Sequence, residues 1–371
     1  MNIEGRIDIR LQRRGDAPAG VHIESSRQQL AQKLLAGRTP EGAANLVGLI
    51  FSLCGNAQRI AAEAACEAAL GLQPDATTRL RRDESILLEL AREHAWRLML
   101  NWPEQAGGPL GIQPDRASLL RLAQAGGDAQ RYAETLNDLL QTSMLGEPAD
   151  TWLTCDLAGF DAWRDGRGTQ LARLFAALGR GPDIGVSQVA LLPSLHDLPD
   201  AAVRDLAACA LTEQAFCAQP LWRGAPAETG AVARLAGQAL LAEWIARRGR
   251  GVGARLLARL LEMAALPGLL ARRSSQPGTG MVRAWSVEGN CGVAAVETSR
   301  GLLLHVVRLH AEKIVDYRIV APTEWNFHPA GALSQALSSL APGSDLAVRA
   351  GLVTQALDPC VTFGVHVSDE N

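Results

Sequence analysis

The sequence lacks the segments that would place the protein in a membrane or on a nucleic acid. It has no run of about 18 or more apolar residues, and the leucine-rich stretch 256–270 is interrupted by Arg259, Glu262 and Pro267. Its N-terminus has no basic segment followed by an apolar stretch, so we expect no export signal. The net charge is −3, and the basic run at 247–250 is too short to form a phosphate-binding face. We therefore expect a protein that binds neither membrane nor nucleic acid.

The sequence also lacks a paired, clustered set of cysteines. Its seven cysteines are scattered over 371 residues, at positions 54, 66, 155, 209, 217, 291 and 360. An odd, scattered set favours a reducing cytoplasm over a disulfide framework. With 47% hydrophobic and 20% charged residues, the chain can build a sizeable core. We expect a globular, cytoplasmic protein.

Apolar periodicity predicts a mainly α fold with a small β part (α+β). Three- and four-residue spacings predict helices between about 25 and 70, within 83–145, and over 231–248, 253–265, 331–340 and 344–355. Thr39 and Pro40 suit the cap and first turn of a helix, and Cys54 is expected near that helix's end. Alternation predicts a short β element within 1–24 and strands at 281–286, 293–298, 302–309 and 314–320. We expect a single intertwined domain, 1–371, with a β-rich segment at 281–330.

Two cysteines stand in incomplete metal-binding motifs. Cys54 precedes a glycine, and Cys360 follows an Asp-Pro step, with His366 beyond it. A second cysteine is expected three positions after each, but Ala57 and Phe363 stand there. Neither side chain can donate an electron pair to a metal. The pattern indicates a metal site altered for a different task, whose two thiols meet only if helices from both chain ends pack together.

Six segments, in order along the chain, resemble the large subunit of nickel-iron hydrogenases. They are 3–6 (Ile-Glu-Gly-Arg), 53–57 (Leu-Cys-Gly-Asn-Ala), 222–234 (Trp-Arg-Gly to Arg), 297–305 (Glu-Thr-Ser-Arg-Gly-Leu-Leu-Leu-His), 317–326 (Tyr-Arg-Ile-Val-Ala-Pro-Thr-Glu-Trp-Asn) and 358–366 (Asp-Pro-Cys-Val-Thr-Phe-Gly-Val-His). Residues 75–215 match poorly, and we interpret them as a divergent helical insertion region. The short length, with one cysteine of each pair retained, resembles the HupK/HoxV group of hydrogenase accessory proteins.

The resemblance implies a hydrogenase-large-subunit-like fold and a role in hydrogenase maturation without catalysis. HupK/HoxV proteins are regarded as scaffolds in assembly of the Fe(CN)2(CO) part of the hydrogenase cofactor. The implied function is to hold this precursor transiently and pass it on. The implied partners are a small HypC-type carrier chaperone, the maturation complex that builds the iron precursor, and the hydrogenase large subunit. The alternative is a metal-free large-subunit mimic that binds maturation chaperones by shape.

The resemblance also implies the candidate site residues. Cys54 and Cys360 match terminal nickel ligands and are the candidate metal ligands. The bound metal unit, iron or nickel, either sits shifted toward these two thiols or is exchanged transiently with a carrier protein. Around them, Arg300 matches an arginine that donates to a cyanide, Pro322 and Thr323 match the step that binds the other cyanide, and Leu303 matches a leucine of the carbonyl pocket. A positive charge at Arg300 would favour thiolates.

Several residues carry alternatives. Arg300 could instead be structural if a buried carboxylate pairs with it, and Glu297 could supply one. Glu4 matches a proton-relaying glutamate, and His366 matches a histidine that binds structural magnesium. The magnesium-binding glutamate of the hydrogenases has no clear match here, which argues against magnesium. His305 is interpreted as a satisfied structural histidine, and His94 as a helix-surface or interface residue.

Overall fold

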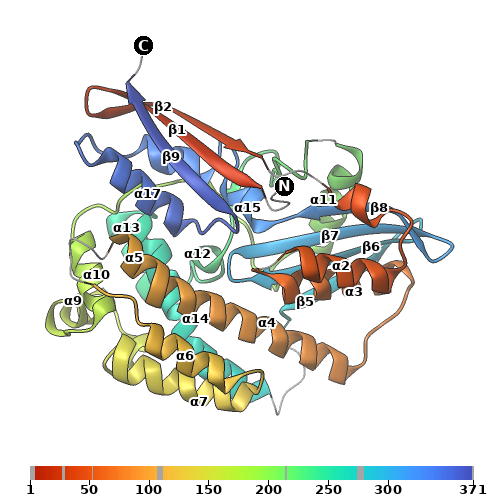
Figure 1. Ribbon diagram of the computed structural model, residues 1–371, viewed down its shortest axis with the longest axis horizontal. Helices are drawn as coiled ribbons and strands as arrows, with labels where there is room; N and C mark the ends of the chain where they lie inside the picture. The colour runs from red at the N-terminus through yellow and green to blue at the C-terminus, as the bar shows by residue number, and fades with distance from the viewer. Residues whose placement is uncertain are drawn as a thin grey trace.

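The computed structural model describes residues 5–26, 30–51, 53–106, 112–213, 215–273 and 280–369 (Figure 1). Glu4 lies outside these residues. The strands are β1 (Arg6–Arg14), β2 (Ala17–Ser25), β3 (Ala190–Leu191), β4 (Ala227–Glu228), β5 (Val282–Val287), β6 (Cys291–Thr298), β7 (Gly301–His310), β8 (Lys313–Val320) and β9 (Thr362–Asp369). The first helices are α1 (Ala31–Leu35), α2 (Pro40–Ile50), α3 (Gly55–Ala69), α4 (Ala76–Trp96), α5 (Trp102–Ala106), α6 (Arg116–Ala125), α7 (Ala129–Leu139), α8 (Ala149–Thr154) and α9 (Leu157–Gly166). The others are α10 (Gln170–Leu178), α11 (Asp200–Thr212), α12 (Ala231–Arg234), α13 (Ala239–Arg248), α14 (Val252–Arg273), α15 (Pro322–Asn326), α16 (Ala332–Ser338) and α17 (Leu346–Ala356).

This element order is a mixed α+β fold, as the sequence predicted. Among the described residues, no helix combines the length and the apolar character needed to cross a bilayer.

The N- and C-terminal segments meet in one small sheet. β1 pairs antiparallel with β2 and parallel with β9, in the order β2-β1-β9, and Ile7 stands opposite Phe363 (Figure 1). Ile7, Ile9 and Leu11 are fully buried on one face of β1, as strand alternation requires. The sequence did not predict β9. The chain ends therefore meet through a parallel strand pair, in addition to the helices that were expected.

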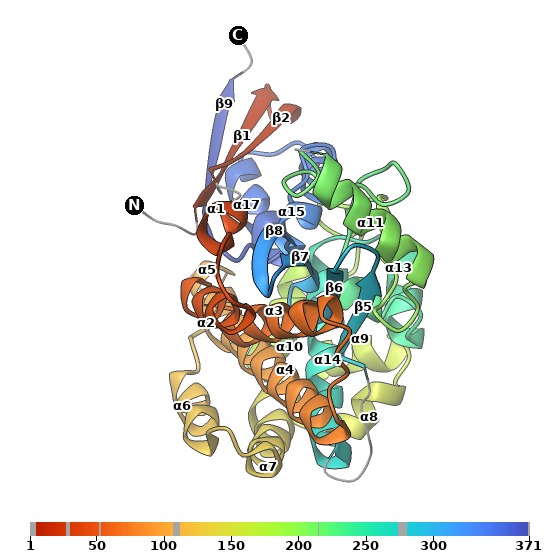
Figure 2. The ribbon, with the colours of Figure 1, turned by 90° about the vertical axis from the view of Figure 1, so that its right-hand side faces the viewer.

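The larger sheet, β5-β6-β7-β8, is antiparallel and is covered on both faces. On one face, Ala294 and Val296 pack with side chains of α1, α2 and α3. On the other face, Val293 and Ala295 pack with α11 and its neighbouring loops (Figure 2). Burial of both faces explains why β6 reads as an almost continuous apolar run. The four strands predicted here are confirmed, within a few residues at each end.

The helical part of the molecule is built around α14, which packs against α4, α7, α8 and α12. The helix predicted at 253–265 continues to Arg273, past Pro267 inside it, because Leu266 and Leu270 are buried in the core. The single helix predicted at 231–248 is wrong: it is two helices, α12 and α13. The Gln238 side chain accepts the Leu241 N–H and caps the second of them.

A π-helical turn, Arg97–Asn101, joins α4 to α5. Pro103 has no backbone N–H, so the Met99 carbonyl loses its usual helical partner. That carbonyl instead accepts the Asp115 N–H at 2.8 Å. Such wide turns are often found at functional sites, and this one begins at Arg97, which contacts the C-terminal cysteine turn described next.

Candidate functional site

Cys54 lies in the break between two helices, near the end of the first, as predicted, and at the start of the next. The preceding helix stops at Ile50, and Cys54 is the N-cap residue of α3. From α4, the Glu89 carboxylate accepts the backbone N–H groups of Asn56 at 2.9 Å and Ala57 at 3.3 Å. A carboxylate is favourable at the positive end of a helix. This contact stabilises the first turn of α3 directly after Cys54 and so fixes the position of Cys54.

Gly55 allows α2 and α3 to pack closely beside this cysteine. A Cβ atom at Gly55 would lie 2.6 Å from the carbonyl oxygen of Gly48, on the facing helix. Such an approach is too short for a real Cβ contact, so any larger residue would push the helices apart. The Cys-Gly step is therefore a packing requirement of the site.

Cys360 is held by the first turn of α15. Pro322 is the first residue of that helix, and Thr323 follows it, buried. The Thr323 hydroxyl donates to the Cys360 sulfur at 3.1 Å and accepts the Cys360 backbone N–H at 3.4 Å. The structure thus places Thr323 directly beside Cys360, with Pro322 preceding it in the same helical turn.

The two thiols and Arg300 come together although they are distant in sequence. Cys54 and Cys360 interact electrostatically with each other and with the Arg300 guanidinium. Burial, followed by the Cys360 sulfur and the Glu89 carboxylate, raises the pKa of Cys54 to about 12, against the opposing effect of Arg300. Arg300 thus favours the thiolate of Cys54, as expected, but the effect of burial on this pKa is larger than that of one nearby cation.

Arg300 is buried and carries two carboxylate partners. Its Nη2 donates to Glu93 Oε2 at 2.7 Å, and its Nε lies 3.5 Å from Asp358 Oδ1. Glu297, the partner offered by the sequence, instead pairs with Arg234 at 2.8 Å. Nη2 thus makes a hydrogen bond to Glu93, whereas Nε, although near Asp358, has no hydrogen-bond partner among the described residues.

The tight turn between β6 and β7 separates Arg300 from Glu297. Thr298 Oγ1 accepts the backbone N–H groups of Arg300 and Gly301, both at 3.2 Å. Gly301 has a φ of +128°, which favours glycine, and its added Cβ would lie 2.4 Å from the Thr229 side chain. This turn directs the Arg300 side chain toward α4 and the C-terminal turn.

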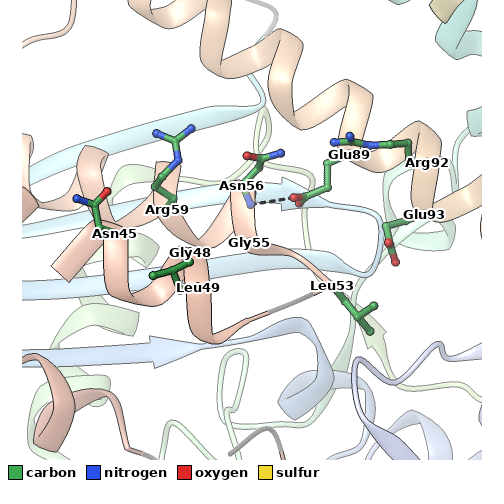
Figure 3. A pocket seen from close by; sticks show the side chains of 10 residues that line it. All are labelled: Asn45, Gly48, Leu49, Leu53, Gly55, Asn56, Arg59, Glu89, Arg92 and Glu93. Atoms are coloured by element: carbon green, nitrogen blue, oxygen red, sulfur yellow. Dashed lines mark hydrogen bonds between the residues drawn. The ribbon is translucent and has the colours of Figure 1, made fainter. Parts of the chain in front are cut away.

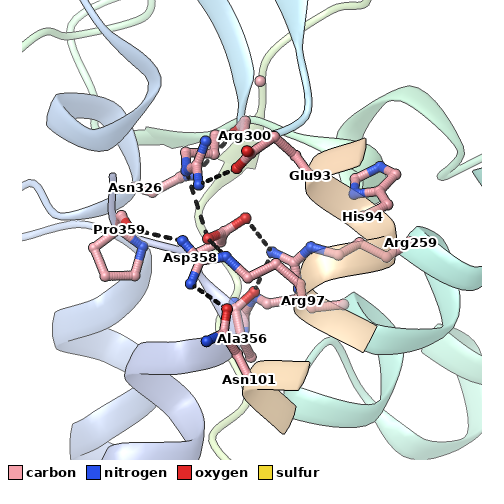
Figure 4. Close-up of polar contacts among 12 residues, drawn as sticks. Glu93, His94, Arg97, Asn101, Arg259, Arg300, Asn326, Ala356, Asp358 and Pro359 are labelled. Atoms are coloured by element: carbon pink, nitrogen blue, oxygen red, sulfur yellow. Dashed lines mark hydrogen bonds and ion pairs between the residues drawn. The ribbon is translucent and has the colours of Figure 1, made fainter. Parts of the chain in front are cut away.

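Asp358 is the centre of a buried charged cluster (Figure 4). Its Oδ1 lies 2.6 Å from Arg97 Nε, and its Oδ2 lies 3.6 Å from Arg259 Nη2. Burial alone would raise the pKa of Asp358, but Arg300, Arg97 and Arg259 together lower it to about 2. Asp358 has a φ of +55°, an uncommon conformation for a non-glycine residue. These ion pairs hold the strained turn that leads into Cys360.

A cleft of about 620 Å³ opens beside Cys54 between α2, α3 and α4 (Figure 3). It is lined by Asn45, Gly48, Leu49, Leu53, Gly55, Asn56, Arg59, Glu89, Arg92 and Glu93. Leu53 and Gly55 flank Cys54 in the chain, and Glu93 is the partner of Arg300. The cleft therefore lies next to the Cys54 turn, although neither thiol is among its lining residues.

The other candidate residues lie further from this cluster or in its walls. Leu303 is fully buried on β7, in the same apolar cluster as Ala57. Phe363 is half-buried on β9 and packs on the main core beside Cys360. His366 is exposed on β9, opposite Arg10 of β1. Throughout the described ranges there is no group of three or more His, Cys, Asp or Glu side chains that could hold a metal ion.

The structure confirms the interpretation of His305 and contradicts that of His94. His305 is satisfied in the core, as predicted, with Nε2 2.8 Å from Gln58 Oε1 and Nδ1 2.7 Å from the Tyr317 hydroxyl. The interpretation of His94 as a surface residue is wrong: it is fully buried, with Nε2 2.6 Å from Glu262 Oε2. The reason is that α4 packs against α14, which places this face of α4 inside the molecule.

Sequence reasoning missed Glu89, Glu93 and Gln58. Glu89 and Glu93 are one helical turn apart on α4, a spacing that marks one helix face, but no sequence signal connects that face to Cys54. Gln58 follows the position of the absent second cysteine, so the first motif could have drawn attention to it.

Comparison with known proteins gives three consistent results. A family model described as nickel-dependent hydrogenase matches residues 275–366. The chain is 32% identical to the hydrogenase expression/formation protein HoxV of Cupriavidus necator, over 94% of this chain and 93% of that protein. It is 30% identical to the hydrogenase expression/formation protein HupK of Rhizobium leguminosarum bv. viciae, again over 94% of this chain and 93% of that protein.

Solved structures of two hydrogenases share the fold. The reduced, active Ni-Fe-Se hydrogenase from Desulfomicrobium baculatum superposes with a TM-score of 0.61 at 16% identity, over 94% of this chain and 95% of that chain. An NAD+-reducing NiFe-hydrogenase in the H2-reduced state gives a TM-score of 0.56 at 17% identity, over 93% of each chain. At these identities the likeness establishes the hydrogenase large-subunit-like fold alone.

Proposed function

Because this chain belongs to the HoxV/HupK family of hydrogenase expression/formation proteins, we propose that it acts in hydrogenase maturation as a scaffold without catalytic activity. In this proposal it receives an Fe(CN)2(CO) precursor as cargo, holds it through Cys54 and Cys360, and passes it to the hydrogenase large subunit. The donor is a small HypC-type carrier chaperone that works with the complex that builds the precursor.

The observation that carries this proposal is the meeting of Cys54, Cys360 and Arg300. Soft thiolates suit an iron that carries strong-field ligands. A six-coordinate iron with three diatomic ligands keeps three open positions, and two thiolates would fill two of them. Such a site binds its cargo with few protein ligands, which favours release over permanent storage.

The guanidinium groups around Asp358 could pair with an anionic cargo. Arg97, Arg259 and Arg300 surround this carboxylate, with Glu93 and Glu262 also nearby. The Arg300 guanidinium could donate to a cyanide nitrogen, and a hydrogen bond to a charged group contributes about 1.5–3 kcal/mol. Leu303 would supply an apolar wall for the carbonyl ligand.

Two other residues near the thiols argue against hydrogen turnover. Ala57 and Phe363 stand where the resemblance places the bridging thiolates of a nickel-iron centre, and neither can bind a metal. We therefore propose a holding role, with the cleft beside Cys54 as the route by which the carrier presents its cargo.

Infrared spectroscopy tests this function. Protein co-expressed with the hydrogenase maturation machinery should show bands of metal-bound CO and CN, and Cys54→Ala or Cys360→Ala should abolish them. Cys155→Ala is the matched control, because Cys155 is a half-buried cysteine at the end of α8 and should leave the bands unchanged. Bands that persist in the double variant C54A/C360A would contradict thiol ligation.

One observation favours a second candidate, the metal-free mimic that binds maturation chaperones. Arg300 already has carboxylate partners in Glu93 and Asp358, so the pocket is electrostatically satisfied without cargo. This candidate predicts that the double variant C54A/C360A still supports hydrogenase maturation in a host that lacks the native protein. The scaffold predicts that maturation falls in that variant.

A further inference from the structure

A chain of buried polar groups leads from the Cys54 sulfur into the large sheet. Gln58 Nε2 donates to Cys54 Sγ at 3.6 Å, and Gln58 Oε1 lies 2.8 Å from His305 Nε2. His305 Nδ1 lies 2.7 Å from the Tyr317 hydroxyl. The Gln58 side chain is on α3, His305 is on β7, and Tyr317 is on β8; all three residues are at most 1% exposed. The chain is therefore shielded from water along its length.

The chemistry of these groups fixes the direction of every hydrogen bond. An amide oxygen can only accept, so His305 Nε2 must carry the proton that it shares with Gln58 Oε1. Burial lowers the pKa of His305 to about 3, so the ring is neutral and Nδ1 must accept from the Tyr317 hydroxyl. Each donor thus points toward Cys54, and hydrogen bonds aligned in one direction strengthen one another.

We propose that Gln58 is a positioning residue for the Cys54 sulfur, with His305 and Tyr317 holding its amide in the donating orientation. The inference rests on the proposed function in that Cys54 is taken as the ligand that receives the cargo. The amide N–H stabilises negative charge on the sulfur and fixes the direction of its free electron pair. Thr323 supplies the equivalent donor to Cys360, so each thiol receives one hydrogen bond from a buried side chain.

The surroundings of Cys54 explain why such a donor matters. Three groups from three elements face this sulfur: Glu89 from α4, Cys360 from the C-terminal turn and Arg300 from the β6–β7 turn. Glu89 and a charged Cys360 disfavour negative charge on Cys54, while Arg300 is shared with Glu93 and Asp358. Gln58, on α3, therefore supplies a hydrogen bond that offsets part of the cost of a negative charge on the buried Cys54 sulfur.

The rate at which iodoacetamide alkylates Cys54 in the metal-free protein tests the proposal. Peptide mass spectrometry at fixed pH follows Cys54, with Cys155 and Cys209 as half-buried reference thiols. Gln58→Leu should slow alkylation of Cys54 about 3- to 10-fold, because a smaller fraction of Cys54 is then thiolate. The greater intrinsic nucleophilicity of the remaining thiolate offsets part of this loss. Tyr317→Phe, which removes the far end of the chain without touching Cys54, should slow it about 2-fold by weakening the chain.

The sign of the change separates positioning from a merely structural role. General loosening of the fold would speed alkylation of Cys54 and of the reference thiols together, and that outcome would overturn the proposal. So would an unchanged Cys54 rate in folded Gln58→Leu. If that variant does not fold, Tyr317→Phe and the nitrogen chemical shifts of His305 in the unaltered protein decide the matter: the neutral Nε2–H tautomer supports the chain, and the Nδ1–H tautomer contradicts it. None of these measurements needs cargo, so they stand whether or not the infrared bands appear.

Discussion

Asp358 Oδ1 lies 3.5 Å from Arg300 Nε, which joins the C-terminal cysteine turn to the turn between β6 and β7. The contact spans two segments that the sequence places 58 residues apart. Arg97 and Arg259 complete the cluster, so that Asp358 is fixed from three sides. Cys360 follows two residues later and is thereby placed where it interacts with Cys54.

Removing the Asp358 charge should destabilise the protein. Asp358→Asn removes the carboxylate that Arg97, Arg259 and Arg300 share, and breaking a buried ion pair costs about 3–5 kcal/mol. Urea unfolding measures the change. Asp345→Asn is the control, because the Asp345 carboxylate is largely exposed where it pairs with Arg349, and its loss should cost at most about 1 kcal/mol. Equal losses in both variants would show that the cluster does not hold the turn.

Glu89 should make stability fall as the pH rises toward neutrality. Burial is the main cause that raises the pKa of Glu89 from 4.5 to about 7. The folded state therefore binds this proton more tightly, and its stabilising contribution is complete below pH 4.5 and lost as the pH rises through about 7. The shift corresponds to roughly 3 kcal/mol.

Glu89→Gln tests this pH dependence directly. Its amide oxygen can still accept the N–H groups of Asn56 and Ala57, but it does not titrate. Unfolding free energies measured between pH 5 and 8 should vary less in the variant than in the parent protein. Two parallel curves would mean that Glu89 titrates normally.

The close approach of α2 and α3 should make Gly55 intolerant of a side chain. Gly55→Ala places a Cβ against the Gly48 carbonyl and should cost about 1–3 kcal/mol. Gly351→Ala on α17 is the matched control, because its Cβ meets nothing within 4 Å, and it should stabilise by about 0.5–1 kcal/mol. Thermal unfolding compares the two, and a Gly55→Ala variant as stable as the parent would refute the packing requirement.

Thr323 should tune the cargo through Cys360. Thr323→Val removes the hydroxyl that donates to the Cys360 sulfur and should cost about 1 kcal/mol in stability. In the loaded protein the CO band should shift to lower frequency, because a sulfur without this hydrogen bond donates more electron density to iron. Thr354→Val, which removes a buried hydroxyl bonded to the Ala350 carbonyl, should cost about the same without moving the band. A shift of the CO band in both variants would mean that altered packing, and not the hydrogen bond to Cys360, causes the shift.

Sequence patterns predicted the parts of this molecule that depend on local order. The helix cap at Thr39, the four strands of the large sheet and the α+β class follow from periodicity and capping, which act over a few residues. The encounter of Cys54, Cys360 and Arg300 was expected from motif order, and the structure places the three together.

The partners of Arg300 could not be predicted in the same way. Glu93 is 207 residues away in sequence, and periodicity carries no information about which helix face meets which turn. Glu297 was the nearer carboxylate, but the turn at Thr298 and Gly301 separates it from Arg300. Strand β9 could not be predicted from local pattern, because its partner β1 lies at the opposite end of the chain.

X-ray absorption at the iron edge tests the central claim most directly. Protein from a maturation-competent host should show two sulfur neighbours of iron together with the carbon atoms of its diatomic ligands, and Cys54→Ala or Cys360→Ala should lack this iron. Iron without sulfur neighbours in the unaltered protein would contradict the account.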